Sequence, residues 1–134
     1  MRKPNVLWIT VDQMRIHEMG CYTKDDRLKA LNTTPNIDAL ARNSVQFENA
    51  FSPNPVCTPA RSCMISGKYG RSCIGTVGNA ADPTRERTLF PTPTIAECFR
   101  DNGYDTAIVG EWNIHNMPQT LGFDDTVYQD VHHL

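Results

Sequence analysis

The chain is organised around the stretch C-T-P-A-R-S-C-M-I-S-G, residues 57–67. Pro59 suits the first position of a helix, where its missing N–H costs nothing. We therefore predict a loop that ends at Cys57 and a helix over residues 59–66, which Gly67 ends. A cysteine just before a helix faces unpaired N–H groups and the positive end of the helix dipole, which favours an activated nucleophile. The alternative is structural, because most free cysteines are small buried apolar residues.

Length and composition describe one soluble domain. The chain has 134 residues, a formal net charge of -2 and 40% hydrophobic residues, which is not the basic excess of a nucleic-acid-binding protein. Its longest apolar run, residues 6–11, is too short to cross a membrane or to serve as the core of a signal peptide. We therefore expect a cytoplasmic protein with no nucleic-acid or membrane partner.

The five cysteines form an odd set without C-x-x-C spacing. Neither a complete disulfide framework nor a zinc site is indicated, so reduced thiols fit better. A thiol-based redox or zinc protein is for this reason the alternative that the sequence supports least. Stoichiometric zinc in the purified protein would revive it.

Three runs rich in β-branched and aromatic residues predict β-strands, at residues 5–11, 45–51 and 104–110. Helices are predicted to open near three prolines, Pro35, Pro59 and Pro93. This alternation predicts an α/β fold with a mainly parallel sheet that is flanked by helices and has right-handed crossovers.

Residues of particular types indicate where the helices begin and end. Thr34 is the expected cap of the first helix, Thr94 or Thr92 caps the last, and Asn102-Gly103 closes it. Residues 74–91 are rich in Gly, Asn, Thr, Asp and Pro, and predict a long surface loop.

Asp12 and Gln13 follow the first predicted strand directly. Open α/β sheets bind ligands at the carboxyl ends of their parallel strands, so these two residues are candidates for a binding site. An aspartate at a strand end can equally be a turn former or a helix cap.

Taken together, the pattern C-x-P-x-R with Ser66-Gly67 after it resembles the signature of the sulfatase family. In that family a maturation enzyme reads the cysteine, proline and arginine and oxidises the cysteine to formylglycine. T-P-N-I-D-x-L-A at residues 34–41 and Gly122-Phe123-Asp124 also resemble the family. Since sulfatases are several times longer, the resemblance implies that residues 1–134 are the N-terminal part of an alkaline-phosphatase-like sandwich.

The resemblance implies a sulfuric ester hydrolase that acts on a small-molecule sulfate ester or a related anionic ester. Cys57 becomes formylglycine, and one hydroxyl of its hydrate is the nucleophile. Asp12, Gln13 and the modified Cys57 hold one divalent cation, with Ca²⁺ the first choice and Mn²⁺ or Mg²⁺ the second, because the ligands are hard oxygens. Arg61 holds the modified side chain and balances negative charge.

The chain departs from the family pattern at two places. Gln13 replaces a second acid, a form similar to that of choline sulfatases and phosphonate monoester hydrolases, which keeps phosphorus esters open as substrates. Relatives follow the third strand with Gly-Lys-x-His, where this chain has Gly110-Glu111-Trp112-Asn113. A carboxylate in place of the lysine opposes an anionic substrate.

His115 is the nearest residue that could replace the missing histidine, and a catalytic role is the hypothesis for it. The alternative is an ordinary loop histidine. Arg71 lies where relatives place a basic cluster, and is either near the anion or on a solvated turn. A different class of hypothesis is a noncatalytic truncated sulfatase fragment, whose open sheet edges favour self-association. The formylglycine-generating maturation enzyme is the expected protein partner.

Overall fold

The computed structural model describes residues 3–29, 31, 34–73, 90 and 93–130. The chain forms two compact units, Met1–Ala50 and Phe51–Leu134, and each is described by itself. The predicted surface loop over 74–91 lies outside the described residues except for Phe90, which is buried. Among the helices of the described ranges, none is long and apolar enough to cross a membrane.

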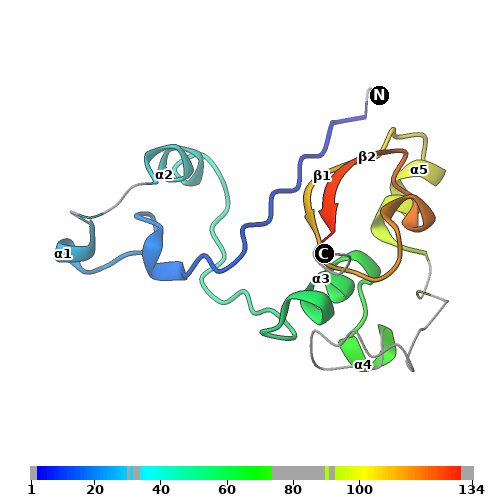
Figure 1. Cartoon of the computed structure of the whole chain (residues 1–134). Helices are drawn as coiled ribbons and strands as arrows, with labels where there is room; N and C mark the ends of the chain where they lie inside the picture. Colours follow the sequence, from blue (N-terminus) through cyan, green and yellow to red (C-terminus); the bar gives the residue numbers. More distant parts are fainter. Residues whose placement is uncertain (1–2, 30, 32–33, 74–89, 91–92, 131–134) are drawn as a thin grey trace. The chain divides into compact units, whose positions relative to one another are not determined.

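The described residues of the first unit form three short helices, η1 (Ile16–Glu18), α1 (Asp26–Lys29) and α2 (Pro35–Ala41) (Figure 1). The start of α2 at Pro35 is as predicted, but the Thr34 side chain makes no capping hydrogen bond to the helix. Its hydroxyl oxygen instead accepts the N–H of Gly20 at 3.1 Å. Asp38 of α2 accepts the N–H of Cys21 at 2.9 Å, so two contacts tie α2 to the segment before α1.

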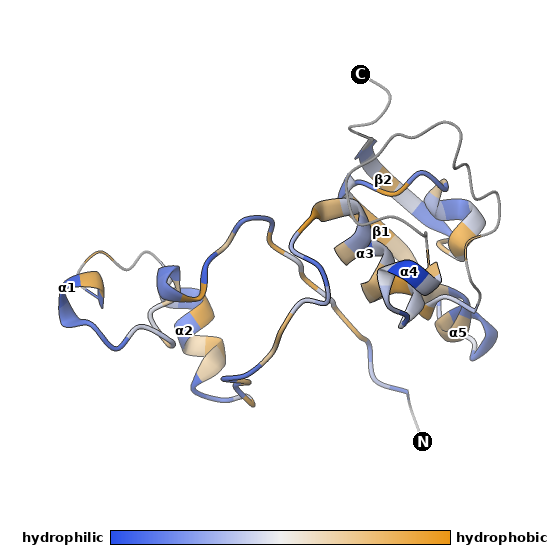
Figure 2. Ribbon diagram, turned by 90° about the horizontal axis from the view of Figure 1, so that it is seen from below, coloured by the Kyte–Doolittle hydropathy of each residue, from blue (hydrophilic) through white to orange (hydrophobic). Residues whose placement is uncertain are grey.

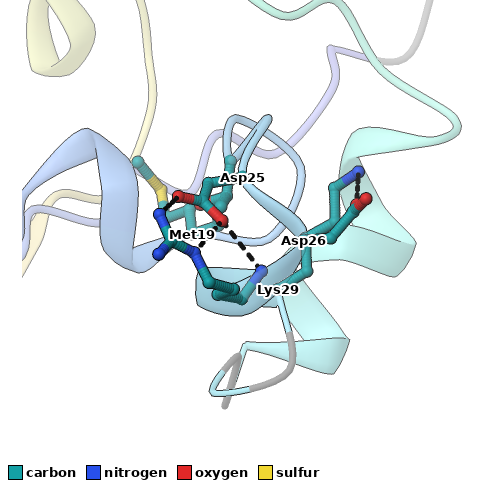
Figure 3. A network of polar contacts seen from close by, with 6 residues as sticks. Met19, Asp25, Asp26 and Lys29 are labelled. Carbon is teal, nitrogen blue, oxygen red and sulfur yellow. Dashed lines mark hydrogen bonds and ion pairs between the residues drawn. The ribbon is translucent and has the colours of Figure 1, made fainter.

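Charged side chains around α1 pair with one another (Figure 3). The guanidinium of Arg27 lies 3.0 Å from the carboxylate of Asp25, and Lys29 lies 3.2 Å from Asp26. The hydrogen bond from Arg27 lowers the pKa of Asp25. Exposed pairs of this kind contribute little to stability, so the charged face of the short helix α1 is a solvated surface.

Two of the predicted strands are absent. Neither residues 5–11 nor residues 45–51 belong to a strand, and Leu7 and Phe47 are exposed. A strand is defined by a ladder of hydrogen bonds to a neighbour, and the described backbone of 5–11 has none. In the second segment a turn at Glu48 and Asn49 interrupts the alternating pattern.

The sheet belongs to the second unit, where β1 (Ala107–Trp112) and β2 (Asp125–Asp130) pair in parallel (Figure 1). β1 begins three residues later and ends two residues later than the third predicted strand, so Glu111 lies within the strand and not after it. Sequence reasoning missed β2. The connection between the two strands contains the short helix η3 (Pro118–Leu121). The α/β class and the parallel pairing are therefore confirmed, with one strand pair among the described residues in place of three predicted strands.

The helix that carries the cysteine, α3 (Cys57–Ser66), begins two residues earlier than predicted. Val56 is extended and caps it, so Cys57 is the first helical residue and Pro59 the third. Proline is tolerated there because the first N–H groups of a helix have no acceptor within it. Gly67 ends the helix in the left-handed conformation, as expected, and α4 (Gly70–Cys73) follows.

The last helix, α5 (Ile95–Asp101), begins and ends as predicted. The Thr94 hydroxyl accepts the N–H of Glu97, and the Glu97 carboxylate accepts the N–H of Thr94 at 2.8 Å, which is a capping box. Asn102 caps the other end.

A small core holds the second unit together, and Figure 2 shows hydrophobic colour along β1. Its buried members come from helix α4, strand β1 and the segments around them: Cys73, Phe90, Trp112, Ile114 and Leu121. Ile65 of α3 and Tyr128 of β2 pack against this cluster. The core therefore joins the helix that begins at Cys57 to the strand that carries Glu111.

Candidate functional site

Cys57 lies half-buried in the first turn of α3. In the second unit, two further residues of the same helix contact the end of β1 and the residues just after it. Thr58 and Arg61 are three residues apart, which places their side chains on one face of the helix. The stretch 57–61 is thus held at the carboxyl end of a parallel strand, the end at which α/β folds bind ligands.

Arg61 makes two contacts with Glu111. Its Nη2 donates to the carboxylate Oε2 of Glu111 at 2.9 Å, and its Nη1 donates to the backbone carbonyl of the same residue at 2.7 Å. The Arg61 side chain is 19% exposed and that of Glu111 is 39% exposed. The Glu111 carboxylate would repel an anionic substrate, but Arg61 of the C-x-P-x-R stretch partly neutralises its charge.

Thr58 and Asn113 form the neighbouring contact. The Thr58 hydroxyl donates to Oδ1 of Asn113 at 3.0 Å, and the two residues are only 1% and 5% exposed. A hydrogen bond this well buried has no water to replace it. Sequence reasoning missed this pair, because the two residues are 55 positions apart and no local pattern links them.

His115 is exposed and lies in the bend that follows β1. Ile114 beside it is 1% exposed and belongs to the core, so the chain turns there from a buried to a solvated position. The Trp112 ring nitrogen donates to the carbonyl of Asn116 at 2.8 Å and closes this bend. The catalytic role of His115 stays a prediction. Arg71 is an exposed residue of α4, and its role near an anion also stays a prediction.

Asp12 and Gln13 lie in an exposed turn of the first unit. Gln13 has a φ of 58°, the one positive φ of a non-glycine residue in the part of the chain that the structure describes. Such a conformation costs about 1–3 kcal/mol and occurs often at ligand sites. The carboxylate and amide oxygens of this turn suit a hard divalent cation.

The predicted metal site is divided between the units, because Asp12 and Gln13 belong to the first and Cys57 to the second. Within the described residues of either unit, no three His, Cys, Asp or Glu side chains are gathered as metal ligands. The ligand set of Asp12, Gln13 and Cys57 therefore stays a prediction, as does its Ca²⁺.

The other thiols differ from Cys57 in their surroundings. The five cysteines, all within the described residues, form no disulfide, and Cys63 and Cys73 are buried in the second unit. Burial raises the pKa of Cys63, so this side chain stays in the protonated thiol form, which is unreactive. Burial and the neighbouring Asp38 carboxylate raise the pKa of Cys21. Cys98 of α5 is exposed.

Comparisons with known proteins agree with the resemblance that the cysteine stretch carries. Residues 4–132 match the family model described as Sulfatase. The chain is 38% identical over 112 residues to an ulvan-active sulfatase of Formosa agariphila, covering 84% of this chain and 20% of the relative. It is 29% identical over 123 residues to an N-acetylglucosamine-6-O-sulfatase of Bacteroides thetaiotaomicron, covering 92% of the chain and 20% of that protein.

A human relative is similar over the same part. The chain is 31% identical over 123 residues to the steryl-sulfatase of Homo sapiens, covering 84% of this chain and 19% of that protein. The chain thus spans about a fifth of the length of these curated relatives.

Proposed function

Because the chain belongs to the sulfatase family, we propose that it supplies the nucleophile-bearing part of a sulfuric ester hydrolase that cleaves a small-molecule sulfate monoester. The observation that supports this most is the C-x-P-x-R stretch in the first turns of α3, with Cys57 as the first helical residue. Relatives named as sulfatases match this part of the chain.

The proposed chemistry begins with oxidation of Cys57 to formylglycine by a maturation enzyme. One hydroxyl of the hydrated aldehyde attacks sulfur, and the bond from sulfur to the alcohol oxygen breaks, so that the alcohol leaves. The second hydroxyl then gives up its proton, the bond between the same carbon and the sulfate oxygen breaks, and the aldehyde re-forms as sulfate leaves. Water then adds to the aldehyde and restores the hydrate. The net reaction consumes one water and one ester.

Asp12 and Gln13 would hold a divalent cation together with the modified residue 57, Ca²⁺ before Mn²⁺ or Mg²⁺. When bound, this cation would stabilise negative charge at the reacting oxygens. Arg61 would orient the modified side chain through its guanidinium, and His115 is the residue proposed to donate a proton to the leaving alcohol.

A phosphonate or phosphate ester is the second substrate class. Gln13 is the residue that makes phosphorus esters candidate substrates. The pairing of Arg61 with Glu111 limits the negative charge that the substrate can carry. Because the Glu111 carboxylate offsets part of the Arg61 charge, this pair attracts an anion less strongly than an unpaired arginine would. The site therefore favours monoanions over dianions. Sulfate monoesters and phosphonate monoesters are monoanions at neutral pH, whereas phosphate monoesters are largely dianions.

Turnover tests this proposal. The full reading frame that encodes the chain is co-expressed with a formylglycine-generating enzyme and assayed on chromogenic sulfate and phosphonate esters, with and without Ca²⁺. We expect sulfate ester hydrolysis that Cys57→Ala abolishes and Cys98→Ala, at an exposed position on α5, leaves unchanged. Hydrolysis of the phosphonate ester alone would show that the substrate is a phosphonate and not a sulfate ester. A folded protein without activity would favour the alternative of a noncatalytic sulfatase fragment.

Self-association remains a second proposal about partners. Val109 and Val127 lie opposite each other in the β1–β2 register and are 78% and 70% exposed. An apolar face of this kind favours contact with another copy. Light scattering that reports a monomer at high concentration would contradict it.

A further inference from the structure

Two residue pairs join α3 to β1 and the residue just beyond its end, and on each side the two members lie close together along the chain. Thr58 and Arg61 are three residues apart on the helix, while Glu111 and Asn113 are two residues apart along extended chain. Side chains at these spacings point to one side of a helix and to one side of extended chain, respectively. The four side chains therefore meet as two adjacent pairs, Thr58 with Asn113 and Arg61 with Glu111.

Glu111 and Asn113 stand where relatives have the lysine and the histidine of Gly-Lys-x-His, residue types suited to binding an anion and to donating a proton. Neither side chain can take over those roles, since a carboxylate repels an anion and an amide does not titrate. Both are instead engaged with the helix whose first residue is Cys57. Their chemistry thus fits a role in holding that helix.

We propose that Glu111 and Asn113 are positioning residues, which fix the first turns of α3 against the carboxyl end of β1 and so set the position of the Cys57 side chain. The importance of that position rests on the proposed function. The contacts themselves do not depend on it, because they involve the unmodified chain.

The two contacts differ in expected strength. The buried bond between Thr58 and Asn113 leaves an acceptor without a partner when it is removed, whereas water can reach the half-exposed carboxylate of Glu111. Loss of the first contact should therefore release the Cys57 turn more than loss of the second.

The test is the rate at which each cysteine of the unmodified 134-residue chain reacts with an alkylating reagent, read for each peptide by mass spectrometry. Cys57 reports the first turn of α3, and Cys63, buried in the same helix, reports opening of the whole unit. Cys98, exposed on α5, corrects for reagent and pH.

Thr58→Val removes the hydroxyl at nearly constant volume, and we expect it to raise the rate at Cys57 about tenfold relative to Cys98. Thr58→Ser keeps the hydroxyl and should stay near the original rate. Glu111→Gln should raise the rate at Cys57 about threefold. The double variant Arg61→Glu with Glu111→Arg restores the pair with its charges exchanged and should return the rate towards the original.

A role in positioning requires that Cys57 reacts faster while Cys63 does not. If both rates rise by the same factor, the two contacts only stabilise the whole unit, and the proposal is wrong. It is also wrong if Thr58→Val and Thr58→Ser behave alike. Because the assay needs neither maturation nor turnover, a failure of the proposed function leaves it readable.

Discussion

The two ends of the β1–β2 pair are held in different ways. At the amino end, Thr106 is 8% exposed, and its hydroxyl lies 2.8 Å from the carboxylate of Asp124. The backbone N–H of Asp124 returns to the carbonyl of Thr106 at 2.9 Å. At the carboxyl end, Glu111 contacts a residue 50 positions away, on α3. The contacts at the amino end join the two strands to each other, and those at the carboxyl end join β1 to the helix that carries Cys57.

This difference separates scaffold from site. The contacts at the amino end join the two segments that lead into the strands, so their loss should weaken the whole unit. Those at the carboxyl end hold one helix turn, so their loss should act locally.

Gly122→Ala should have the largest effect on stability. Gly122 has a φ of 95°, and an added Cβ would lie 2.6 Å from the backbone nitrogen of Glu97. We expect a loss of about 3 kcal/mol or more in the free energy of unfolding, measured with urea. Gly67→Ala is the matched control, since Gly67 has a φ of 65° with nothing within 4 Å of an added Cβ. It should lose only about 1 kcal/mol; equal losses would contradict the close approach at Gly122.

Thr106→Val should cost about 1–2 kcal/mol, because a hydroxyl bonded to Asp124 is replaced by a methyl group. Urea unfolding measures this loss. Alkylation then distinguishes the two ends of the sheet: Cys57 and Cys63 should react faster by the same factor, unlike the pattern expected for Thr58→Val. If Thr106→Val raised the alkylation rate of Cys57 alone, the amino and carboxyl ends of the strand pair would not differ in the way described.

Acid should weaken the amino end. Hydrogen bonds from the side chain and backbone of Thr106 lower the pKa of Asp124 below 3.8, its ordinary value. The folded state therefore binds this proton less readily than the unfolded state, so the stabilisation is present above pH 3.8 and is lost as the pH falls through the lowered pKa. Urea unfolding between pH 5 and pH 2 should show this loss, and Asp124→Asn should reduce its slope. An unchanged slope in Asp124→Asn would contradict the assignment.

Glu111→Gln should have the smallest effect on overall stability, within about 1 kcal/mol, because the pair with Arg61 is partly exposed. Thermal unfolding in low and high salt measures it, and high salt should reduce the difference between the variant and the original chain. A loss as large as that of Thr106→Val would show that the carboxyl end is also part of the scaffold.

Helix ends were the features most open to prediction from sequence. Thr94 with Glu97 and Gly67 act through contacts within a few residues, so local residue types are sufficient. Strands were harder, because a strand exists only with its neighbour. Residues 5–11 have strand composition without a ladder among the described residues, and β2 has a ladder without a strong apolar pattern.

The candidate site shows the same division. The spacing of Cys57, Pro59 and Arg61 lies within one short stretch and was recognisable at once. The partner of Arg61 is 50 residues away and could not be predicted from local pattern. Glu111 was therefore interpreted only as an unfavourable charge, although the structure gives it a partner.

The chemical state of residue 57 decides whether Cys57 is the nucleophile position. After co-expression with a formylglycine-generating enzyme, trypsin releases residues 43–61, in which Cys57 is the only cysteine. Mass spectrometry should find an aldehyde in place of the thiol, which an aldehyde-specific probe captures, and Cys57→Ala should carry none. A thiol that stays unmodified throughout would contradict the assignment of Cys57 as the nucleophile position.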